Sequence, residues 1–372
     1  MKKYLIFSLA AAIFLCTALA GAAGGDASDP IISLSYLKDK FTAAFDELVD
    51  GALVHADESL SSDVDIALEK AAAASNVSHA ESYVDMRLDG GDILCVFEGA
   101  SVIIYAGDVT ASFTAGTLID VTDGSELASG EQLVPMHRYL ASEGADASLC
   151  AASKTAALTL CGPYTLVNGG GTDYTAMADA LRTLSLFKGS DTAYGKGYDL
   201  EKESTRVQAL IMLIRLLGEE DEALACTEPS PFADMKKSNN AWAEPYVAYA
   251  YSKGYTNGVS ATEFAPAATV NAQQYVEFVL RALGYSSTEN TDVSTSPARA
   301  LEAGVLTQGE CSALTGGAAF LRADVVYLSY YALDTKIAQS EQRLHEKLSA
   351  AGIFDAESYT TACAHVTSSR IS

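Results

Sequence analysis

Residues 244–258 read EPYVAYAYSKGYTNG, and residues 270–283 read VNAQQYVEFVLRAL. The first stretch is typical of a helix that runs into a glycine turn, and the second carries apolar residues at helical spacing. The pair predicts one helix–turn–helix unit. Because a unit of this size cannot bury its apolar face alone, we expect it to pack against other units of the same kind.

Two further segments repeat this pattern. Residues 177–189 read MADALRTLSLFKG and residues 297–309 read PARALEAGVLTQG, so each combines a helical run with a glycine turn. A second helix follows each of the three segments. These second helices are predicted over residues 204–217, 270–283 and 321–333.

The register of the three units agrees across their loops. Tyr198, Phe264 and Leu314 lie eight residues before Arg206, Ala272 and Arg322. Two of the second helices also end alike, because RLLG at residues 215–218 recurs as RALG at residues 281–284. Glycine is a common helix stop. The three units therefore predict an all-α, pseudo-threefold bundle with one shared core.

The N-terminal half has a different character. Val84, Met86 and Leu88 alternate with polar residues, as in a half-buried strand. Short apolar runs punctuated by glycine follow at residues 93–97, 102–105, 118–121 and 157–161. They predict a small antiparallel sheet or a barrel-like unit. Residues 26–75 have a helical pattern, so the expected fold class is α+β: a β-rich domain with flanking helices, followed by the helical bundle.

Glycine-rich residues 168–171 separate the two halves and form the expected domain boundary. Residues 337–348 are amphipathic, so a helical tail is expected to pack on one of the domains. The expected organisation is a signal peptide at 1–25, an N-terminal module at 26–167, three repeats within 168–335 (about 172–220, 229–286 and 290–335) and a tail at 336–372.

The first residues predict export. A positive start (MKK, residues 1–3) precedes an apolar run over residues 4–19, and two A-x-A sites follow within residues 18–22. This combination is typical of a secretory signal peptide. A lipoprotein signal at Cys16 is disfavoured, because Leu15 stands where a small residue is expected. No later run is long and apolar enough to span a membrane, so we expect a secreted protein without a span in its mature chain.

The chain is strongly acidic, with 24 lysine and arginine residues against 48 aspartate and glutamate residues and a formal net charge of −24. It has no basic stripe that would neutralise the phosphates of a nucleic acid, which argues against nucleic-acid binding. An anionic membrane surface is disfavoured for the same reason. Solubility at a crowded surface explains the acidity, and cation binding at the surface is the alternative.

Six cysteines follow the predicted signal peptide: Cys95, Cys150, Cys161, Cys226, Cys311 and Cys363. An even number permits disulfides in a secreted chain. Cys150 and Cys161 stand on neighbouring predicted strands and are the expected pair if any pair forms. The alternative is that most of the cysteines are small buried residues.

A search for chemistry finds no catalytic constellation. The five histidines lack the spacing of a metal pair, and neither H-E-x-x-H nor G-x-S-x-G nor C-x-x-C occurs. The acidic stretch DVTDGSE at residues 120–126 has only a loose similarity to a calcium loop, and we interpret it as a turn between strands. We therefore expect no cofactor, no metal and no enzymatic activity.

The repeats carry a family resemblance. The motifs are PFAD at 231–234, WA at 242–243, GYTNG at 254–258, FAP at 264–266, STRVQ at 204–208 and LRAD at 321–324. In combination they resemble the S-layer homology pattern, which runs F-x-D, W-A, a glycine turn, F-x-P and a T-R-A-E helix start. The resemblance covers roughly residues 170–335, just under half of the chain.

The resemblance implies a bacterial cell-surface protein, anchored to the wall because its bundle has grooves for an anionic, often pyruvylated, secondary cell-wall polysaccharide. The T-R-A-E arginine is the implied anion contact, and we expect free amides in that first helical turn to assist it. An aromatic such as Trp242 can pack against a sugar face. Other surface-layer proteins are further expected partners. The implied polysaccharide-binding residues are Thr205, Arg206, Asp234, Trp242, Tyr246 and Arg322.

The repeats also depart from the pattern. NAQQ at residues 271–274 replaces T-R-A-E in the second repeat, whose arginine is therefore missing, and the third repeat has lost most of its opening. A degenerate scaffold for protein–protein or adhesive contacts is thus one alternative to the wall anchor, and a wall-targeted hydrolase is another. The alternative to an anion contact for Arg206 and Arg322 is that each is a solvated residue in a first helical turn. The alternative to sugar contact for Trp242 is that it packs in the core.

Overall fold

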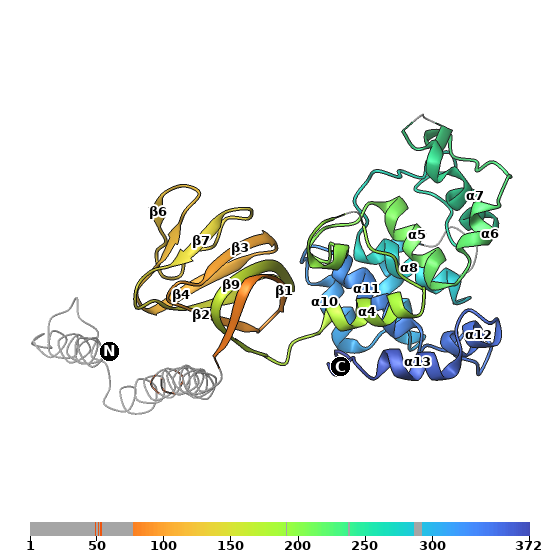
Figure 1. The fold of residues 1–372 in the computed structure, drawn as a ribbon. Coiled ribbons are helices and arrows are strands. Elements are labelled where there is room, and N and C mark those ends of the chain that lie inside the picture. Colours follow the sequence, from red (N-terminus) through yellow and green to blue (C-terminus); the bar gives the residue numbers. More distant parts are fainter. Residues whose placement is uncertain are drawn as a thin grey trace, which may run out of the picture. The chain divides into compact units, whose positions relative to one another are not determined.

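The computed structural model describes Val49, Gly51, Leu53 and residues 77–372 apart from 191, 237–238 and 286–291. The predicted signal peptide and the predicted helices of residues 26–75 lie outside the described residues, apart from those three isolated positions. An antiparallel sheet is followed by a helical part, which confirms the predicted α+β class (Figure 1). No helix among the described residues is long and apolar enough to cross a membrane.

The described β-region is a nine-stranded antiparallel sheet. The strands are β1 (Ser78–Asp89), β2 (Ile93–Phe97), β3 (Ser101–Ala106), β4 (Val109–Ala115), β5 (Leu118–Asp120), β6 (Ser125–Glu126), β7 (Arg138–Ala141), β8 (Asp146–Ala151) and β9 (Thr155–Val167). Their order is β4-β8-β2-β9-β3-β7-β5-β6, and β1 also pairs with β9. Three of them, β4, β6 and β7, were not predicted from the sequence.

The long strand β9 holds the sheet together, because it pairs with β1, β2 and β3. Its neighbours also correct the cysteine prediction. β2 lies between β8 and β9, so Cys150 and Cys161 are not on adjacent strands. The Cys161 thiol donates a hydrogen bond to the carbonyl of Ala80 at 3.4 Å. Cys150 and Cys161, the pair expected if any disulfide forms, are therefore not bonded to each other.

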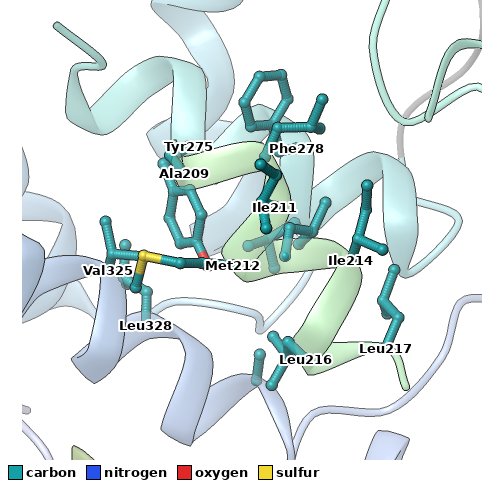
Figure 2. Packing of buried hydrophobic residues seen from close by; sticks show 14 of the residues in the cluster. Ala209, Ile211, Met212, Ile214, Leu216, Leu217, Tyr275, Phe278, Val325 and Leu328 are labelled. Carbon is teal, nitrogen blue, oxygen red and sulfur yellow. The ribbon is translucent and has the colours of Figure 1, made fainter. Parts of the chain in front are cut away.

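Three helices of eleven residues each form the centre of the helical part: α5 (Arg206–Leu216), α8 (Ala272–Ala282) and α11 (Arg322–Ala332). Each packs against the other two. Figure 2 shows Met212 of α5 in one buried cluster with Tyr275 of α8 and Val325 of α11. Their bounds agree with the predicted second helices to within two residues, because apolar periodicity marks all three and capping residues mark the starts of α5 and α8.

An outer helix covers each central one. These are α4 (Tyr174–Thr183), α7 (Glu244–Ser252) and α9 (Ser296–Glu302). α7 packs on α5, α9 packs on α8, and α4 packs on α11. Each outer helix thus lies against the central helix that precedes it in the chain, and the first outer helix lies against the last central one. The arrangement is cyclic, so a turn after an outer helix meets two central helices at three related positions, which we call grooves.

Shorter elements complete the helical part. They are α6 (Glu220–Leu224), α10 (Gln308–Thr315), α12 (Leu344–Ala350), α13 (Ala356–Cys363), and the 3-10 helices η3 (Gly195–Gly197), η4 (Ala233–Lys236), η5 (Ala241–Ala243) and η6 (Val293–Thr295). α13 packs on α4 and α12. Residues 366–372 follow α13 without regular structure, and we call this segment the strap.

Candidate functional site

Arg206, the first residue of α5, lies in the first of the three grooves, which we call groove A. Its side chain is buried, with the residue only 5% exposed. The guanidinium carbon lies 5.0 Å from the ring centre of Phe264 and 4.8 Å from that of Phe278. Nη2 donates to the carbonyl of Gly258 at 3.4 Å. Nε is buried and has no hydrogen-bond partner among the described residues. Arg206 is therefore a buried cation with a donor left over, not a solvated helix start.

The backbone amides beside Arg206 are already bonded. The amide of Arg206 donates to the carbonyl of Ala268 at 2.8 Å, and that of Val207 donates to Pro266 at 3.2 Å. The next amide, of Gln208, is capped by Thr205 Oγ1 at 3.4 Å. The expectation of free amides in this turn is wrong, because the neighbouring loop satisfies them. An anion in groove A would depend on the guanidinium.

A second arginine, which the sequence analysis did not single out, faces the same groove. Arg281 is residue ten of α8, and its Nε donates to Glu277 Oε1 at 2.7 Å. Its Nη1 is buried and has no partner among the described residues. A cavity of about 50 Å³ lies between the two arginines, which is room for a carboxylate-sized group. Its lining is Arg206, Tyr255, Thr256, Asn257, Gly258, Gln274, Glu277, Phe278, Arg281 and Val293.

Electrostatics make groove A receptive to an anion. Burial lowers the pKa of Arg206 to about 10, so the side chain is still charged at neutral pH but poorly compensated. Burial would raise the pKa of Glu277, but hydrogen bonds from Ser296 and Arg299 lower it overall. Glu277 is thus a carboxylate already shared by Arg281 and Arg299. Positive charge remains in excess in this groove.

A second groove, groove C, is built in the same way around Arg322, the first residue of α11. The guanidinium lies 6.0 Å from the ring centre of Phe187, and Nε is buried without a partner among the described residues. Burial is the main cause that lowers its pKa; Asp199 acts in the opposite direction, and Arg215 reinforces the lowering. Arg215 is residue ten of α5, as Arg281 is of α8. Grooves A and C therefore each combine arginines at helix positions one and ten.

The other predicted site residues lie outside the groove A cavity or are engaged in structural contacts. Asp234 accepts backbone hydrogen bonds from Phe264 at 3.0 Å and Ala265 at 2.7 Å, and so holds the F-x-P loop. The Tyr246 hydroxyl donates to Glu220 at 3.1 Å. Trp242 is 60% exposed, so it does not pack in the core, but it does not line the groove A cavity. Thr205 lies beside groove A, where its role is to cap the start of α5.

Two comparisons with known proteins bear on these grooves. Residues 231–274 match the S-layer homology domain. A protein named "Cell surface protein" from Thermoanaerobacter kivui is 36% identical over 89 residues, which cover 24% of this chain and 11% of that relative. The chain thus spans about a tenth of the relative's length. Both findings support a role at the cell surface.

The S-layer homology match has a definite place in the fold. It begins just before η4, includes α7 and the turn at residues 254–258, and ends in the first turn of α8. It therefore includes the turn and Gln274, which line groove A, but neither of the two groove arginines. The domain match and the unpartnered donors are separate observations that lead to the same groove.

The acidic turn at residues 120–126 joins β5 to β6, as interpreted from the sequence. Asp120, Asp123 and His137 place donor atoms within 4.8 Å of one another there. Both carboxylate oxygens of Asp120 are already engaged, because Oδ1 accepts from two backbone amides of the turn and Oδ2 lies 2.7 Å from His137 Nδ1. Hydrogen bonding and an ion pair account for the cluster.

This ion pair predicts a pH dependence. The hydrogen bond to Asp120 raises the pKa of His137 above 6.5. For Asp120, burial opposes ionisation, but hydrogen bonds from His137 and from the turn amides lower its pKa below 3.8. The histidine's contribution to stability is full below pH 6.5 and is lost as pH rises through its folded pKa. The carboxylate's contribution is full above pH 3.8 and is lost as pH falls through its folded pKa.

Proton NMR titration of His137 checks this prediction. We expect an imidazole pKa above 6.5 in the native chain, and a fall in that pKa in Asp120→Asn. Asp123→Asn is the matched control and should lower it less, because Asp123 contributes only the smallest of the raising effects. Equal shifts in the two variants would contradict the assigned pair.

Proposed function

We propose that the chain is a non-enzymatic, secreted surface protein held to the cell wall by anionic polysaccharide bound in grooves A and C. The observation that carries this proposal is that Arg206 and Arg281 line one cavity in groove A and that each has a buried donor, Nε and Nη1, without a partner among the described residues. Buried donors without partners destabilise a fold by about 1–3 kcal/mol each, so a ligand that satisfies them is favoured.

A carboxylate is the ligand chemistry that suits this site. It is planar, it accepts two hydrogen bonds from guanidinium donors, and it fits a cavity of about 50 Å³. A pyruvate ketal on a sugar presents such a group at the end of a neutral ring. A pyruvylated secondary cell-wall polysaccharide therefore fits the groove, and the exposed Trp242 offers an apolar face for another sugar of the polymer.

We further propose that residues 172–220, 229–286 and 290–335 are three repeats of the S-layer homology type. The family match covers part of the second one. The equal lengths of α5, α8 and α11 and the cyclic packing of their outer helices support extending it to the other two.

Co-sedimentation with purified cell walls tests the anchoring role. The native chain is compared with an Arg206→Ala, Arg322→Ala double variant on walls with and without their secondary polysaccharide. We expect retention that needs the polysaccharide and an affinity loss of about 100-fold or more in the double variant, since each charge-assisted contact contributes about 1.5–3 kcal/mol.

A double variant with the same loss of charge is the control. Arg138→Ala, Arg343→Ala removes two arginines that lie outside the grooves, and it should bind walls within about twofold of the native chain. If both double variants bind alike, or if the native chain ignores the polysaccharide, the grooves are not the anchor. The repeats would then act as a scaffold for protein–protein contacts.

A further inference from the structure

The third groove, groove B, differs from the other two in the residues that define it. Its central-helix positions one and ten are Ala272 of α8 and Tyr331 of α11, so neither arginine is present. Only about 10 Å³ of space remains in it. The space is lined by Val276, Val279, Val305, Leu306, Leu328, Tyr331, Ala332 and Arg370. The last of these residues belongs to the strap.

The side chain of Arg370 lies in groove B, although Arg370 belongs to the strap and not to a central helix. Its Nη2 donates to the carbonyl of Val305 at 2.7 Å, in the turn after α9, just as Arg206 donates to the turn carbonyl of Gly258 in groove A. Its guanidinium lies 5.0 Å from the ring centre of Tyr331. The strap thus supplies a guanidinium to the groove whose own arginines are missing.

A buried carboxylate, that of Glu310, binds Arg370 in groove B. Glu310 is 1% exposed and accepts from Arg370 Nε at 2.7 Å and from Nη2 at 2.9 Å. This bidentate pair fixes the plane of the guanidinium. A buried carboxylate in this place would repel the anionic group that suits grooves A and C. Without Arg370 the charge of groove B would be negative, and with Arg370 the pair is neutral, so groove B lacks the excess positive charge of groove A.

Backbone contacts continue along the strap. The amide of Ile371 donates to the Tyr327 hydroxyl at 2.9 Å, and its carbonyl accepts from Thr307. Ser368 receives hydrogen bonds at both its hydroxyl, from the amide of Asp173 at 3.2 Å, and its carbonyl, from Tyr331. Main-chain bonds combined with a side-chain pocket are one of the ways in which proteins recognise a peptide.

We propose that groove B is a peptide-binding groove selective for arginine, and that its ligand is the strap of the same chain. It follows that groove B takes no anionic polymer, which leaves two wall-binding grooves rather than three. This consequence rests on the proposed function, whereas the assignment of the strap as the ligand does not.

Hydrogen exchange at the Ile371 amide tests the assignment in the full chain. We expect exchange at least about tenfold slower than in a free peptide for the native chain, and close to the free-peptide rate in Arg370→Ala. Arg370→Ala, Glu310→Gln is the second variant, because it removes the buried charge while an amide can still bond the Tyr327 hydroxyl. Arg343→Ala is the control and should keep the native rate. Unprotected Ile371 in the native chain, or full protection in both Arg370 variants, would overturn the proposal.

A peptide supplied in trans tests selectivity. A labelled peptide of residues 364–372, AHVTSSRIS, is titrated into each protein. It should bind the double variant Arg370→Ala, Ile371→Gly, whose own strap is weakened, and bind the native chain at least about tenfold less, since the tethered strap competes at high effective concentration. The same peptide with alanine for arginine should not bind. Equal binding of the two peptides, or no binding to the variant, would contradict an arginine-selective groove.

Wall co-sedimentation separates this proposal from the proposed function. Arg370→Ala should bind walls within about twofold of the native chain, because grooves A and C are unchanged. If the exchange and peptide tests fail while wall binding is normal, only the assignment of the strap as the ligand of groove B is rejected. Loss of wall binding in Arg370→Ala would instead place an anionic ligand in groove B and reject the inference that groove B takes no anionic polymer.

Discussion

Replacing Arg206 with methionine should leave the chain as stable as the native protein, within about 1 kcal/mol, yet weaken its binding to wall polysaccharide at least about tenfold. The buried Nε has no partner among the residues that the structure describes, so its removal relieves the desolvation of an unsatisfied donor. Methionine fills the space between Phe264 and Phe278 and makes favourable sulfur–aromatic contacts in place of the two cation–π contacts. Stability and binding should therefore separate at this position.

Urea denaturation and wall co-sedimentation of the same preparations measure the two quantities. Thr205→Ala is the matched control, because it removes the cap that accepts from the Gln208 amide. We expect it to destabilise the chain by about 1 kcal/mol with unchanged wall binding. A loss of more than about 2 kcal/mol in Arg206→Met would show that the guanidinium holds the fold together, and the proposed anion contact would have to be abandoned.

The central helices were predictable because local signals agreed. α5, α8 and α11 have apolar periodicity and glycine or polar residues after their ends, and α5 and α8 also have polar caps, Thr205 and Asn271, before their first turns. The missed strands lack such agreement. β6 has two residues and β7 four, too few to show alternation, and β4 reads VTASFTA, where small and polar residues hide its buried face. Their partners in the sheet, not their own sequences, make them strands.

The site was predictable only in part, for a related reason. Arg206 and Arg322 stood at a recognised motif position, and the RxLG recurrence at 215–218 and 281–284 marked Arg215 and Arg281 without a role. Each groove joins position one of one helix to position ten of another, and this register between repeats is absent from a linear pattern. Asp234 belongs to the motif because it holds the loop backbone.

A substitution with a larger effect on stability, Glu277→Ala, should destabilise the chain by about 3–5 kcal/mol. Glu277 is 4% exposed and accepts from Ser296 at 2.7 Å, from Arg281 at 2.7 Å and from Arg299. Without it, the Arg281 guanidinium, whose side chain is 5% exposed, remains as an uncompensated buried charge. In a helical part of this size, that loss of stability should lower Tm by roughly 6–20 °C.

Removing the charge of Glu277 should strengthen the binding of wall polysaccharide, although it weakens the fold. Glu277 is the one carboxylate among the described residues that line groove A, so its removal strengthens the attraction for an anion. We expect Glu277→Gln, measured on the folded protein, to bind wall polysaccharide about fivefold more tightly, since a nearby charge contributes about 1 kcal/mol even at high dielectric. Glu302→Ala, on the exposed face of α9, is the control and should change stability by no more than about 0.5 kcal/mol and leave binding unchanged. Arg206→Met would then weaken binding without a loss of stability, whereas Glu277→Gln would strengthen binding. A purely structural role for either residue does not produce these changes in binding. If Glu277→Gln instead weakens binding, Glu277 orients Arg281 for the ligand, and the net positive charge of groove A is not what selects the polymer.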